Sequence, residues 1–330
     1  MQYRRLGESD LNISVVTFGA WAIGGWMWGG QDEADAVAAI RKAIDLGVTT
    51  IDTAAVYGFG ASEELIAKAV GKDRDRVLIF TKYGLRWDTD KGTARFETQD
   101  LQGRPITVRR YAAADGVIHE CEQSLRRLGT DHIDLYQCHW PDPDTPIEET
   151  MGAIERLIKD GKVRYAGLSN YSVEEIAAAR KIVPIVSDQP PYSMLRRGIE
   201  DDILPYCRKN NVGVIVYSPL QRGILTGKVT MDRQFEPGDH RADMPEYQPA
   251  NRKRVLAFLD ELRPIADAHG ATLAQLVVNW TVHRDGVTAA LVGARNPRQA
   301  EENAKALDFD LSEEETRGIN ELVDGIKLDM

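Results

Sequence analysis

Short runs of β-branched and aliphatic residues alternate with longer amphipathic stretches along most of this chain. Such alternation favours a parallel sheet whose strands are joined by right-handed helical crossovers. Eight such runs in 330 residues predict a (β/α)8 TIM barrel, a fold of roughly 250 residues, with length to spare. The strands are expected at residues 15–18, 49–52, 77–81, 133–139, 163–169, 185–189, 213–217 and 289–292.

Helical patterns lie between most of these runs. They are expected at residues 33–46, 63–70, 110–128, 147–159, 173–181 and 273–282. The competing architecture is a doubly wound dinucleotide-binding sheet, which needs a glycine-rich turn directly after an early strand. The segment 58–63, Gly-Phe-Gly-Ala-Ser-Glu, lacks the third glycine of that turn, so the barrel is favoured.

Three segments are additional to the eight strand–helix units of the barrel. Residues 3–6 and 11–14 predict a small β-hairpin ahead of the first barrel strand. Residues 221–251, after the seventh strand, are long, polar and rich in glycine and proline, as in a functional lid or a disordered insert. Residues 312–323 predict an extra C-terminal helix. Because no low-complexity linker divides the sequence, we expect a single domain over residues 1–330.

The charge balance narrows the range of partners. The 41 Lys and Arg residues against 51 Asp and Glu residues give a formal net charge of −10, which argues against binding to nucleic acid or to an anionic membrane. The first residues contain no apolar signal-peptide core, and no run approaches the roughly 18 apolar residues of a membrane span. Three cysteines without metal spacing (Cys121, Cys138 and Cys207) favour a reduced, cytoplasmic setting.

The chemistry of a barrel enzyme lies at the carboxyl ends of its strands. The second predicted strand ends at Asp52 and is followed by Tyr57, the third ends beside Lys82, and the fourth ends at His139. Alternation along the third strand places Lys82 on the same face as Phe80, so its ammonium group rises from an apolar layer. Three neighbouring strands are therefore expected to bring an acid, a phenol, an amine and an imidazole to one rim.

These four side chains suit proton transfer to a carbonyl oxygen. A tyrosine hydroxyl has an ordinary pKa of about 10, and we expect the ammonium group of Lys82 to lower the pKa of Tyr57. Asp52 would hold Lys82 charged, and His139 would donate a hydrogen bond that orients the carbonyl. The set predicts hydride transfer to a carbonyl, coupled to protonation of its oxygen by Tyr57.

Each of these residues also has a structural interpretation, as a strand-end acid, a packing ring, a surface lysine or an ordinary histidine. Their common location favours the catalytic interpretation. Segment 139–144 has no second His or Cys cluster beside it, so no metal site is expected. The remaining histidines are interpreted as structural or solvated: His119, His132, His240, His269 and His283.

Most tryptophans follow predicted strands. Trp21, Trp26 and Trp28 follow the first strand, Trp87 the third and Trp140 the fourth. Aromatic rings on these loops predict an apolar cleft at the mouth of the barrel. We expect Trp21, Trp28 and Trp140 to form a wall for the substrate; the alternative is that some of these rings only cap the barrel.

Motifs spread in order over nearly the whole chain resemble those of the aldo-keto reductases. They are Gly19-Ala20-Trp21, Ile51-Asp52-Thr53-Ala54-Ala55-Val56-Tyr57-Gly58 with Ser62-Glu63-Glu64, Thr81-Lys82, Asp134-Leu135-Tyr136-Gln137-Cys138-His139-Trp140, Gly167-Leu168-Ser169-Asn170, Gln189-Pro190-Pro191-Tyr192, Tyr217-Ser218-Pro219-Leu220, Gly227-Lys228 and Val292-Gly293-Ala294. Within that family the chain most resembles bacterial NADP(H)-dependent general-stress and glyceraldehyde or polyol reductases, because of segments 139–143 and 146–150.

The resemblance implies roles for individual residues. Tyr57 matches the general acid, Lys82 and Asp52 the pair that tunes it, and His139 the residue that orients the carbonyl. The implied contacts to the dinucleotide are Gly19, Ala20 and Trp21 after the first strand; Ser169, Asn170 and Gln189 at the nicotinamide carboxamide; Tyr217 on the nicotinamide ring; Ser218, Leu220, Gly223 and Lys228 at the pyrophosphate; and Gly293, Arg295, Gln299, Glu302 and Asn303 at the adenosine end.

The choice of cofactor has a physical argument. Asn296 followed by Pro297 is typical of a helix start, whose free N–H groups attract an anion. Arg295 and Arg298 flank that point, and arginine suits a phosphate. An adenosine 2′-phosphate fits there, which favours NADP(H) over NAD(H). The alternative is a solvated basic turn.

The expected activity is reversible NADP(H)-dependent reduction of aldehydes and ketones to alcohols. The resemblance implies small hydrophilic carbonyls such as glyceraldehyde and sugar or polyol couples, and the aromatic loops would also admit aromatic aldehydes. One alternative is a cofactor-loaded binding or sensor subunit like the β subunits of potassium channels; another is a non-redox barrel lyase or isomerase. The family is mostly monomeric, so a monomer or weak homo-oligomer is expected.

Overall fold

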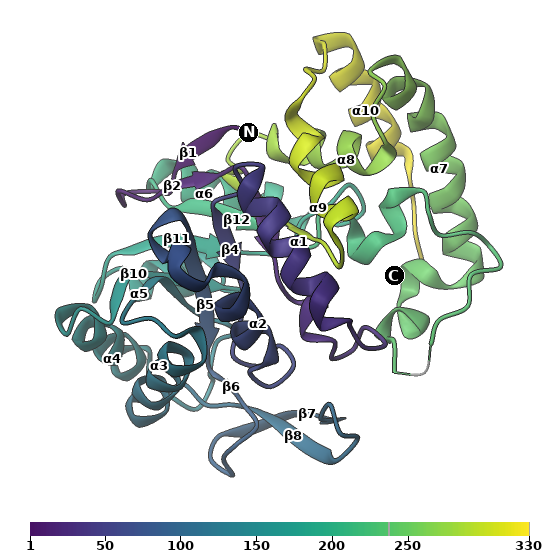
Figure 1. Cartoon of the computed structure of the whole chain (residues 1–330). Helices are drawn as coiled ribbons and strands as arrows, with labels where there is room; N and C mark the ends of the chain where they lie inside the picture. Colours follow the sequence, from purple (N-terminus) through teal and green to yellow (C-terminus); the bar gives the residue numbers. More distant parts are fainter. Residues whose placement is uncertain (237, 330) are drawn as a thin grey trace.

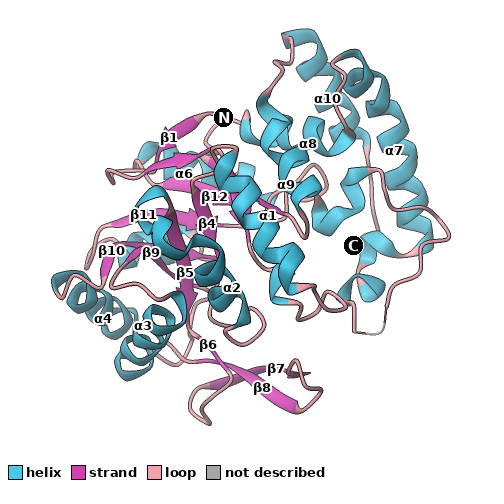
Figure 2. Ribbon diagram, in the orientation of Figure 1, coloured by secondary structure: helices cyan, strands magenta, loops and turns pink. Residues whose placement is uncertain are grey.

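A closed barrel of eight parallel strands forms the centre of the computed structural model, which describes residues 1–236 and 238–329 (Figures 1 and 2). Each strand pairs with the next along the chain, and the last closes on the first through Val292 and Phe18. The barrel prediction is confirmed, and every predicted strand overlaps an observed one. The strands are β3 (Val16–Gly19), β4 (Thr50–Asp52), β5 (Leu78–Tyr83), β9 (Ile133–Cys138), β10 (Val163–Ser169), β11 (Ile185–Gln189), β12 (Gly213–Val216) and β13 (Ala289–Gly293).

Helices cover the outside of the barrel (Figure 2). They bury one apolar face each; α3, for example, buries Val117, Cys121 and Leu128 at helical spacing. The predicted extra helix is confirmed as α10, which begins after a capping box formed by Ser312 and Glu315. The helices are α1 (Glu33–Asp45), α2 (Ala61–Val70), α3 (Ala114–Leu128), α4 (Ile147–Lys159), α5 (Val173–Ala179), α6 (Ile203–Lys209), α7 (Pro249–Ala268), α8 (Leu273–Val282), α9 (Pro297–Ala304) and α10 (Glu313–Gly325).

The predicted hairpin, β1 (Tyr3–Arg5) and β2 (Asn12–Ser14), closes the amino end of the barrel. Leu6, Leu11 and Ile13 are buried in the apolar cluster that includes Phe80 inside the barrel. Gly7 makes the turn with φ +52°, and a Cβ there would lie 2.3 Å from a backbone oxygen of the barrel. The tight seal therefore requires glycine at this position.

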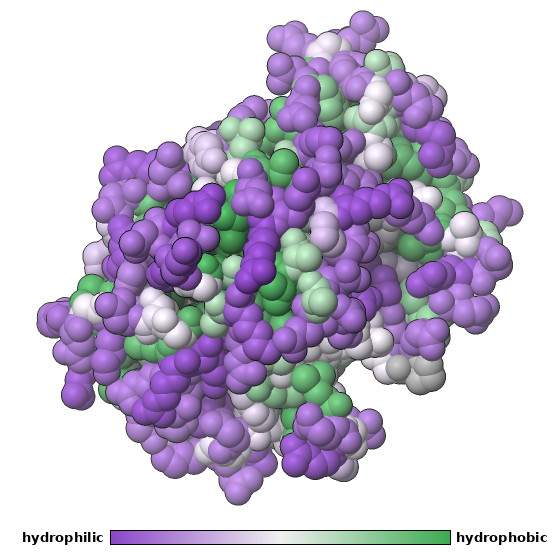
Figure 3. Space-filling model, viewed as in Figure 1, coloured by the Kyte–Doolittle hydropathy of each residue, from purple (hydrophilic) through white to green (hydrophobic). Residues whose placement is uncertain are grey.

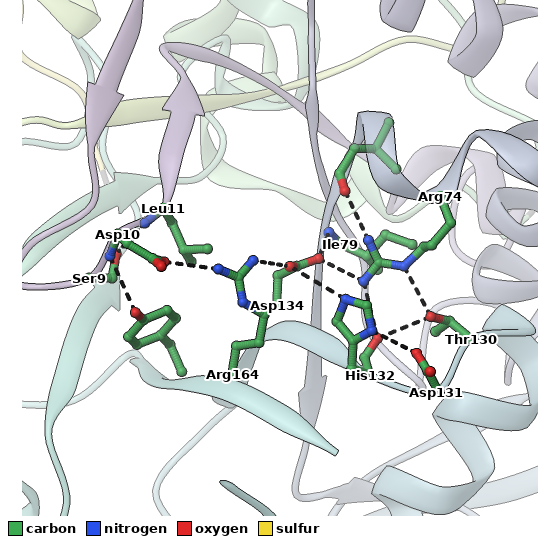
Figure 4. Close-up of polar contacts among 12 residues, drawn as sticks. Ser9, Asp10, Leu11, Arg74, Ile79, Thr130, Asp131, His132, Asp134 and Arg164 are labelled. Carbon is green, nitrogen blue, oxygen red and sulfur yellow. Dashed lines mark hydrogen bonds and ion pairs between the residues drawn. The ribbon is translucent and has the colours of Figure 1, made fainter. Parts of the chain in front are cut away.

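An ion network reinforces the same end of the barrel (Figure 4). Asp134 is 1% exposed; it accepts hydrogen bonds from Arg74 and Arg164, each at 2.7 Å, and from the backbone N–H of Ile79 at 2.9 Å. Arg164 also donates to Asp10, at 2.9 Å. One buried carboxylate thus ties β5, β9 and β10 to the hairpin.

One sheet was not predicted. An antiparallel sheet of β6 (Leu85–Arg86), β8 (Pro105–Arg110) and β7 (Thr93–Gln99), in that spatial order, lies between β5 and α3 and projects from the lower part of the barrel in Figure 1. The helix expected at residues 110–128 therefore begins later, at Ala114. Because no residue of β7 is buried, this strand has no clear apolar face.

The predicted loop at residues 221–251 is partly structured. It contains 3-10 turns at Gln221–Thr226, His240–Asp243 and Pro245–Tyr247, and one of its residues, Pro237, lies outside the described residues. The loop ends earlier than expected, because α7 begins at Pro249. A proline is well tolerated at the first position of a helix, where its missing N–H costs no hydrogen bond.

Polar residues dominate the surface. Figure 3 shows hydrophilic residues over most of this face, with apolar ones mainly in the grooves between helices. Within residues 1–236 and 238–329, no helix combines the length and the apolar character that crossing a bilayer requires.

Candidate active site

The carboxyl ends of three adjacent strands bring the predicted polar residues together. Asp52 ends β4, Lys82 lies near the end of β5, and His139 follows β9 directly. In the barrel β4 pairs with β5 and β5 with β9, so the three side chains belong to neighbouring strands. Tyr57, on the loop after β4, joins them. The common location expected from the sequence is what the structure contains.

Lys82 is the centre of this cluster and is 1% exposed. Its Nζ donates to Oδ1 of Asp52 at 2.5 Å and to the carbonyl oxygen of Thr53 at 2.8 Å. The hydroxyl oxygen of Tyr57 lies 3.5 Å from the same nitrogen. The stem of Lys82 shares its face of β5 with Phe80, which is buried in the apolar cluster inside the barrel.

Two glutamines complete the surroundings of Asp52. The Nε2 atoms of Gln137 and Gln189 donate to Oδ2 of Asp52 at 3.0 Å and 2.7 Å. Together with Lys82 they give both carboxylate oxygens hydrogen-bond partners. These partners compensate for the cost of burying the charge of Asp52. The sequence reasoning gave no role to Gln137, although its alternation with the inward-facing Leu135 along β9 was a usable signal.

The side chains after β10 form a second hydrogen-bonded group beside the cluster. Asn170, in a left-handed conformation with φ +64°, donates from Nδ2 to the carbonyl oxygen of His139 and to Oγ of Ser169, both at 3.0 Å. Its Oδ1 accepts from the hydroxyl of Tyr217 at 2.8 Å, and Oγ of Ser169 donates to the carbonyl oxygen of Gln189 at 2.8 Å. The group fixes both the amide of Asn170 and the ring of Tyr217.

Burial sets the protonation states of the site. It raises the pKa of Tyr57 well above its ordinary value, and the nearby charge of Asp52 adds to that rise. The expected lowering of the Tyr57 pKa by Lys82 is therefore not found, because removal from water dominates. Burial and the charges of Lys82 and Arg95 hold the pKa of His139 well below its usual range. At neutral pH the phenol carries its proton and the imidazole is neutral.

A cavity of about 710 Å³ opens at this end of the barrel. Its volume falls within the roughly 300–1,000 Å³ of small-molecule and cofactor sites. Asp52, Tyr57 and His139 line it, whereas Lys82 lies behind them. All the residues expected at the dinucleotide line this same cavity: Gly19, Ala20, Trp21, Ser169, Asn170, Gln189, Tyr217, Ser218, Leu220, Gly223, Lys228, Gly293, Arg295, Gln299, Glu302 and Asn303.

The tryptophans form much of the cavity wall. The rings of Trp21 and Trp28 meet edge to face with centroids 5.4 Å apart, and Trp21 lies against Tyr57 at 6.1 Å. Trp140 lines the cavity as well. Trp87 packs instead on Phe59, at 5.6 Å. The rings expected to form a substrate wall thus surround the space in front of Tyr57.

His240, on the loop after β12, contacts residues of the loop after β3. Its ring lies 5.0 Å from Trp21 and 5.1 Å from Trp28, and its Nδ1 lies 2.6 Å from the carbonyl oxygen of Met27. The sequence reasoning interpreted His240 as structural or solvated, but it lines the cavity. The aromatic neighbours that identify its position lie more than 200 residues away along the chain, so no local pattern revealed it.

The far end of the cavity holds basic groups that are already paired. Lys228 donates to Glu302 at 2.7 Å. Arg295 donates to Oε1 of Gln31 at 2.7 Å, to the carbonyl oxygen of Trp28 at 3.3 Å, and to that of Gly30. The guanidinium group predicted for a phosphate thus meets neutral oxygens in this structure.

The helix start expected beside Arg295 is confirmed. The side chain of Asn296 accepts a hydrogen bond from the backbone N–H of Gln299, and Pro297 is the first residue of α9. Arg298, in the first turn, is exposed.

Comparison with known proteins agrees with this geometry. The sequence profile of the Aldo/keto reductase family matches residues 15–324. The chain belongs to the aldo/keto reductase family. Members of this family act on carbonyl compounds and use a nicotinamide cofactor, so the predicted reaction class is confirmed at this level.

Individual aldo/keto reductases match the chain over almost its full length. Aldo-keto reductase YhdN of Bacillus subtilis is 38% identical over 98% of this chain and 94% of its own length. The NADH-specific methylglyoxal reductase of Escherichia coli is 33% identical, covering 98% of both chains. The solved structure of glycerol dehydrogenase AKR11B4 from Gluconobacter oxydans superposes with a TM-score of 0.87 at 38% identity, covering 98% of this chain and 95% of the other.

Proposed function

We propose that this protein catalyses the reversible, nicotinamide-dependent reduction of aldehydes and ketones, with Tyr57 as the proton donor. The observation that carries the proposal is the position of the Tyr57 hydroxyl, 3.5 Å from Nζ of the buried Lys82, in the wall of a cavity shared with His139. The cluster places a proton donor, a cation and a hydrogen-bond donor around one small space, as carbonyl reduction requires.

The residues that line the cavity fit a dinucleotide. Gly19 and Gly293 sit on adjacent strands, where the absence of side chains admits a flat ring. The side-chain amide of Asn170 and the ring of Tyr217 are held by hydrogen bonds beside them. Basic side chains suited to phosphates also line the cavity: Arg222, Lys228, Arg233, Arg241 and Arg295. When bound there, the nicotinamide supplies the hydride.

The chain's own residues supply the rest of the chemistry. The neutral imidazole of His139 donates a hydrogen bond to the substrate oxygen and fixes its orientation. Tyr57 then transfers its proton to that oxygen as negative charge develops on it. The adjacent ammonium group of Lys82 stabilises the resulting phenolate, and Asp52 keeps Lys82 charged and in place. The tryptophan wall excludes water, which strengthens each of these interactions.

We propose NADP(H) as the preferred cofactor. Arg295 and Arg298 flank the start of α9, where their two guanidinium groups suit a 2′-phosphate. Arg295 is hydrogen-bonded to neutral oxygens, and a phosphate dianion competes well with these because charged hydrogen bonds are stronger. The name of the Escherichia coli relative specifies NADH, and kinetics with both cofactors test the preference of this chain.

Small hydrophilic carbonyls and polyol couples are the proposed substrates. A methylglyoxal reductase and a glycerol dehydrogenase among the relatives support this class. The rings of Trp21, Trp28 and Trp140 add apolar surface that suits aromatic aldehydes. We further propose that the enzyme works in the cytoplasm as a monomer or weak homo-oligomer.

Replacement of one hydroxyl group tests the reaction. We expect Tyr57→Phe to lower kcat for a reactive aldehyde by about a hundredfold or more, because general acid catalysis contributes on the order of 10²–10⁴-fold. Cofactor binding, measured by tryptophan fluorescence, should change little. The matched control is Tyr83→Phe, since Tyr83 follows Lys82 on the opposite face of β5 and packs on Tyr136 at 4.7 Å. Turnover of Tyr57→Phe near that of the wild type would contradict the proposal. If the wild-type protein itself binds cofactor but reduces no aldehyde, the alternative of a sensor subunit is favoured.

A further inference from the structure

A basic side chain without an acidic partner stands at the mouth of the cavity. The guanidinium carbon of Arg95 lies 4.1 Å from the ring centroid of Trp140, and both residues line the cavity. Among the residues that the structure describes, no carboxylate oxygen lies within 4.0 Å of the nitrogens of Arg95. Arg95 is therefore available to an anion from solution.

The backbone of β7 delivers this side chain to the mouth. Ala94 pairs with Arg109 and Phe96 pairs with Val108, so Arg95 is the extra residue of a β-bulge. Bulges change the direction of a side chain and are common beside active sites. The contact between Arg95 and Trp140 thus has a specific structural cause in the antiparallel sheet that the sequence reasoning missed.

The surroundings of Arg95 are electropositive. Burial and the like charge of Arg110 lower the pKa of Arg95. Within the described part of the chain, the carboxylates that line the cavity belong to Asp52 and Glu302, and each already pairs with a lysine. The guanidinium group of Arg95 therefore has no carboxylate partner among the described residues that line the cavity, and an anion placed there would gain from its charge.

Arg95 also lies beside the carbonyl site. Its stacking partner, Trp140, directly follows His139 in the chain, and the charge of Arg95 contributes to the lowered pKa of His139. An anion bound by Arg95 would therefore lie close to a carbonyl compound that faces His139, so the position of Arg95 bears on substrate choice.

We propose that Arg95 binds an anionic group of the substrate, a carboxylate or a phosphate, so that oxo acids or phosphorylated aldehydes are preferred to neutral carbonyls. The inference rests on the proposed function and names a substrate class for it. Arginine suits this role because its planar fork of N–H donors matches the paired oxygens of either anion, and stacking on Trp140 holds the fork in place.

Two pairs of aldehydes test the proposal and distinguish the two anions. The carboxylate pair is 4-carboxybenzaldehyde and methyl 4-formylbenzoate; the phosphate pair is glyceraldehyde 3-phosphate and glyceraldehyde. In the wild type we expect kcat/KM to favour at least one anionic member by about tenfold or more, the ratio that about 1.4 kcal/mol provides. Arg95→Gln should remove that preference while leaving the neutral aldehydes within about twofold. Arg95→Lys should keep part of it, because the charge remains without the fork.

Arg109→Gln is the matched control. Arg109 lies on β8 opposite Ala94, immediately beside the bulge, and donates to the carbonyl oxygen of Gly92 at 3.2 Å. The substitution removes the same charge from the same sheet, and we expect both substrate ratios to stay at their wild-type values. An equal loss in the Arg109 and Arg95 variants would show a general effect of charge and would overturn the assignment to Arg95.

The outcomes separate this inference from the proposed function. If both aldehydes of each pair are reduced equally well, or if Arg95→Gln lowers all four alike, the proposal is overturned and Arg95 only packs on Trp140. Equilibrium binding gives a readout that does not depend on turnover: by calorimetry, 4-carboxybenzyl alcohol should bind the wild type more tightly than 4-(hydroxymethyl)benzamide, and Arg95→Gln should abolish the difference. That binding result without reduction of any aldehyde would keep the anion site and reject the reductase.

Discussion

The side-chain nitrogen of Lys82 lies 3.5 Å from the hydroxyl oxygen of Tyr57. Burial and the charge of Lys82 act on the proton of Tyr57 in opposite senses at different stages of the proposed reaction. Before proton transfer, burial raises the pKa of Tyr57 and keeps the hydroxyl protonated. After transfer, the cation beside it stabilises the phenolate. The same burial that opposes ionisation in the resting enzyme strengthens this later attraction.

The pH dependence of aldehyde reduction follows from these directions. The proposed reaction needs Tyr57 protonated and His139 neutral. The pKa of Tyr57 is raised above its ordinary value, and the pKa of His139 is held well below its own. We therefore expect kcat/KM for reduction to stay nearly constant between about pH 6.5 and pH 10, the ordinary values of the two groups. A pH–rate profile checks this. A fall in rate below about pH 7 that disappears in His139→Asn would contradict the assignment of a neutral imidazole.

The loop after β12 should respond to the cofactor. We expect NADPH to slow proteolytic cleavage within residues 221–251, because this loop lies over the cavity through the contacts of His240 with Trp21 and Trp28. His240→Ala should increase the cofactor dissociation rate by about tenfold, measured by stopped-flow fluorescence, because it removes both aromatic contacts. His119→Ala, an exposed histidine beside Asp88, is the control. Equal cleavage with and without NADPH would mean that the loop does not cover the cofactor.

Cofactor preference should depend on Arg295. We expect Arg295→Ala to lower kcat/KM with NADPH by about tenfold or more and to leave the value with NADH within about twofold, because NADH lacks the 2′-phosphate. Gln31→Ala should act in the opposite direction, since it frees the guanidinium group from an acceptor at 2.7 Å. Steady-state kinetics with both cofactors provide the ratios. An unchanged ratio in Arg295→Ala would reject the 2′-phosphate assignment.

The stability of the barrel should depend on Asp134. Asp134→Asn leaves Arg74 and Arg164 without their shared carboxylate. We expect the free energy of unfolding to fall by about 2 kcal/mol. This is below the usual loss of about 3–5 kcal/mol for a buried pair, because Arg164 is partly exposed. Urea denaturation followed by circular dichroism measures the change. Asp131→Asn removes an exposed carboxylate that pairs with His132, so it should lower the free energy of unfolding much less than Asp134→Asn does. Equal effects of the two substitutions would mean that the network adds no stability.

The sequence predicted the barrel because its strands are short apolar runs bounded by amphipathic helices. It did not predict β7, which buries no residue and so leaves no periodic signal. Helix α7 was missed for a different reason: it begins with Pro249 and contains Pro264, and proline ordinarily marks the end of a helix. Packing of Val255, Leu259 and other apolar side chains compensates for that cost.

The sequence could predict those residues of the candidate site that lie at the end of a strand. Asp52, Lys82 and His139 are of this kind. Sequence patterns could not show the direction of the Arg95 side chain, because it depends on a β-bulge. They could not show the hydrogen bond between Arg295 and Gln31 either, because these residues lie far apart in the chain. The pKa of Tyr57 also escaped prediction, because its direction depends on how completely neighbouring loops remove the hydroxyl from water.

The hairpin at the amino end of the barrel has a consequence for turnover. Leu6, Leu11 and Ile13 plug that end, so reactants and products pass through the opposite one. In the proposed reaction, the dinucleotide would be held by residues at the strand ends that line the cavity, and the carbonyl compound would enter after it by the same opening. The cofactor would then bind first and leave last. A high concentration of aldehyde at the opening of the cavity would slow the exchange of the cofactor.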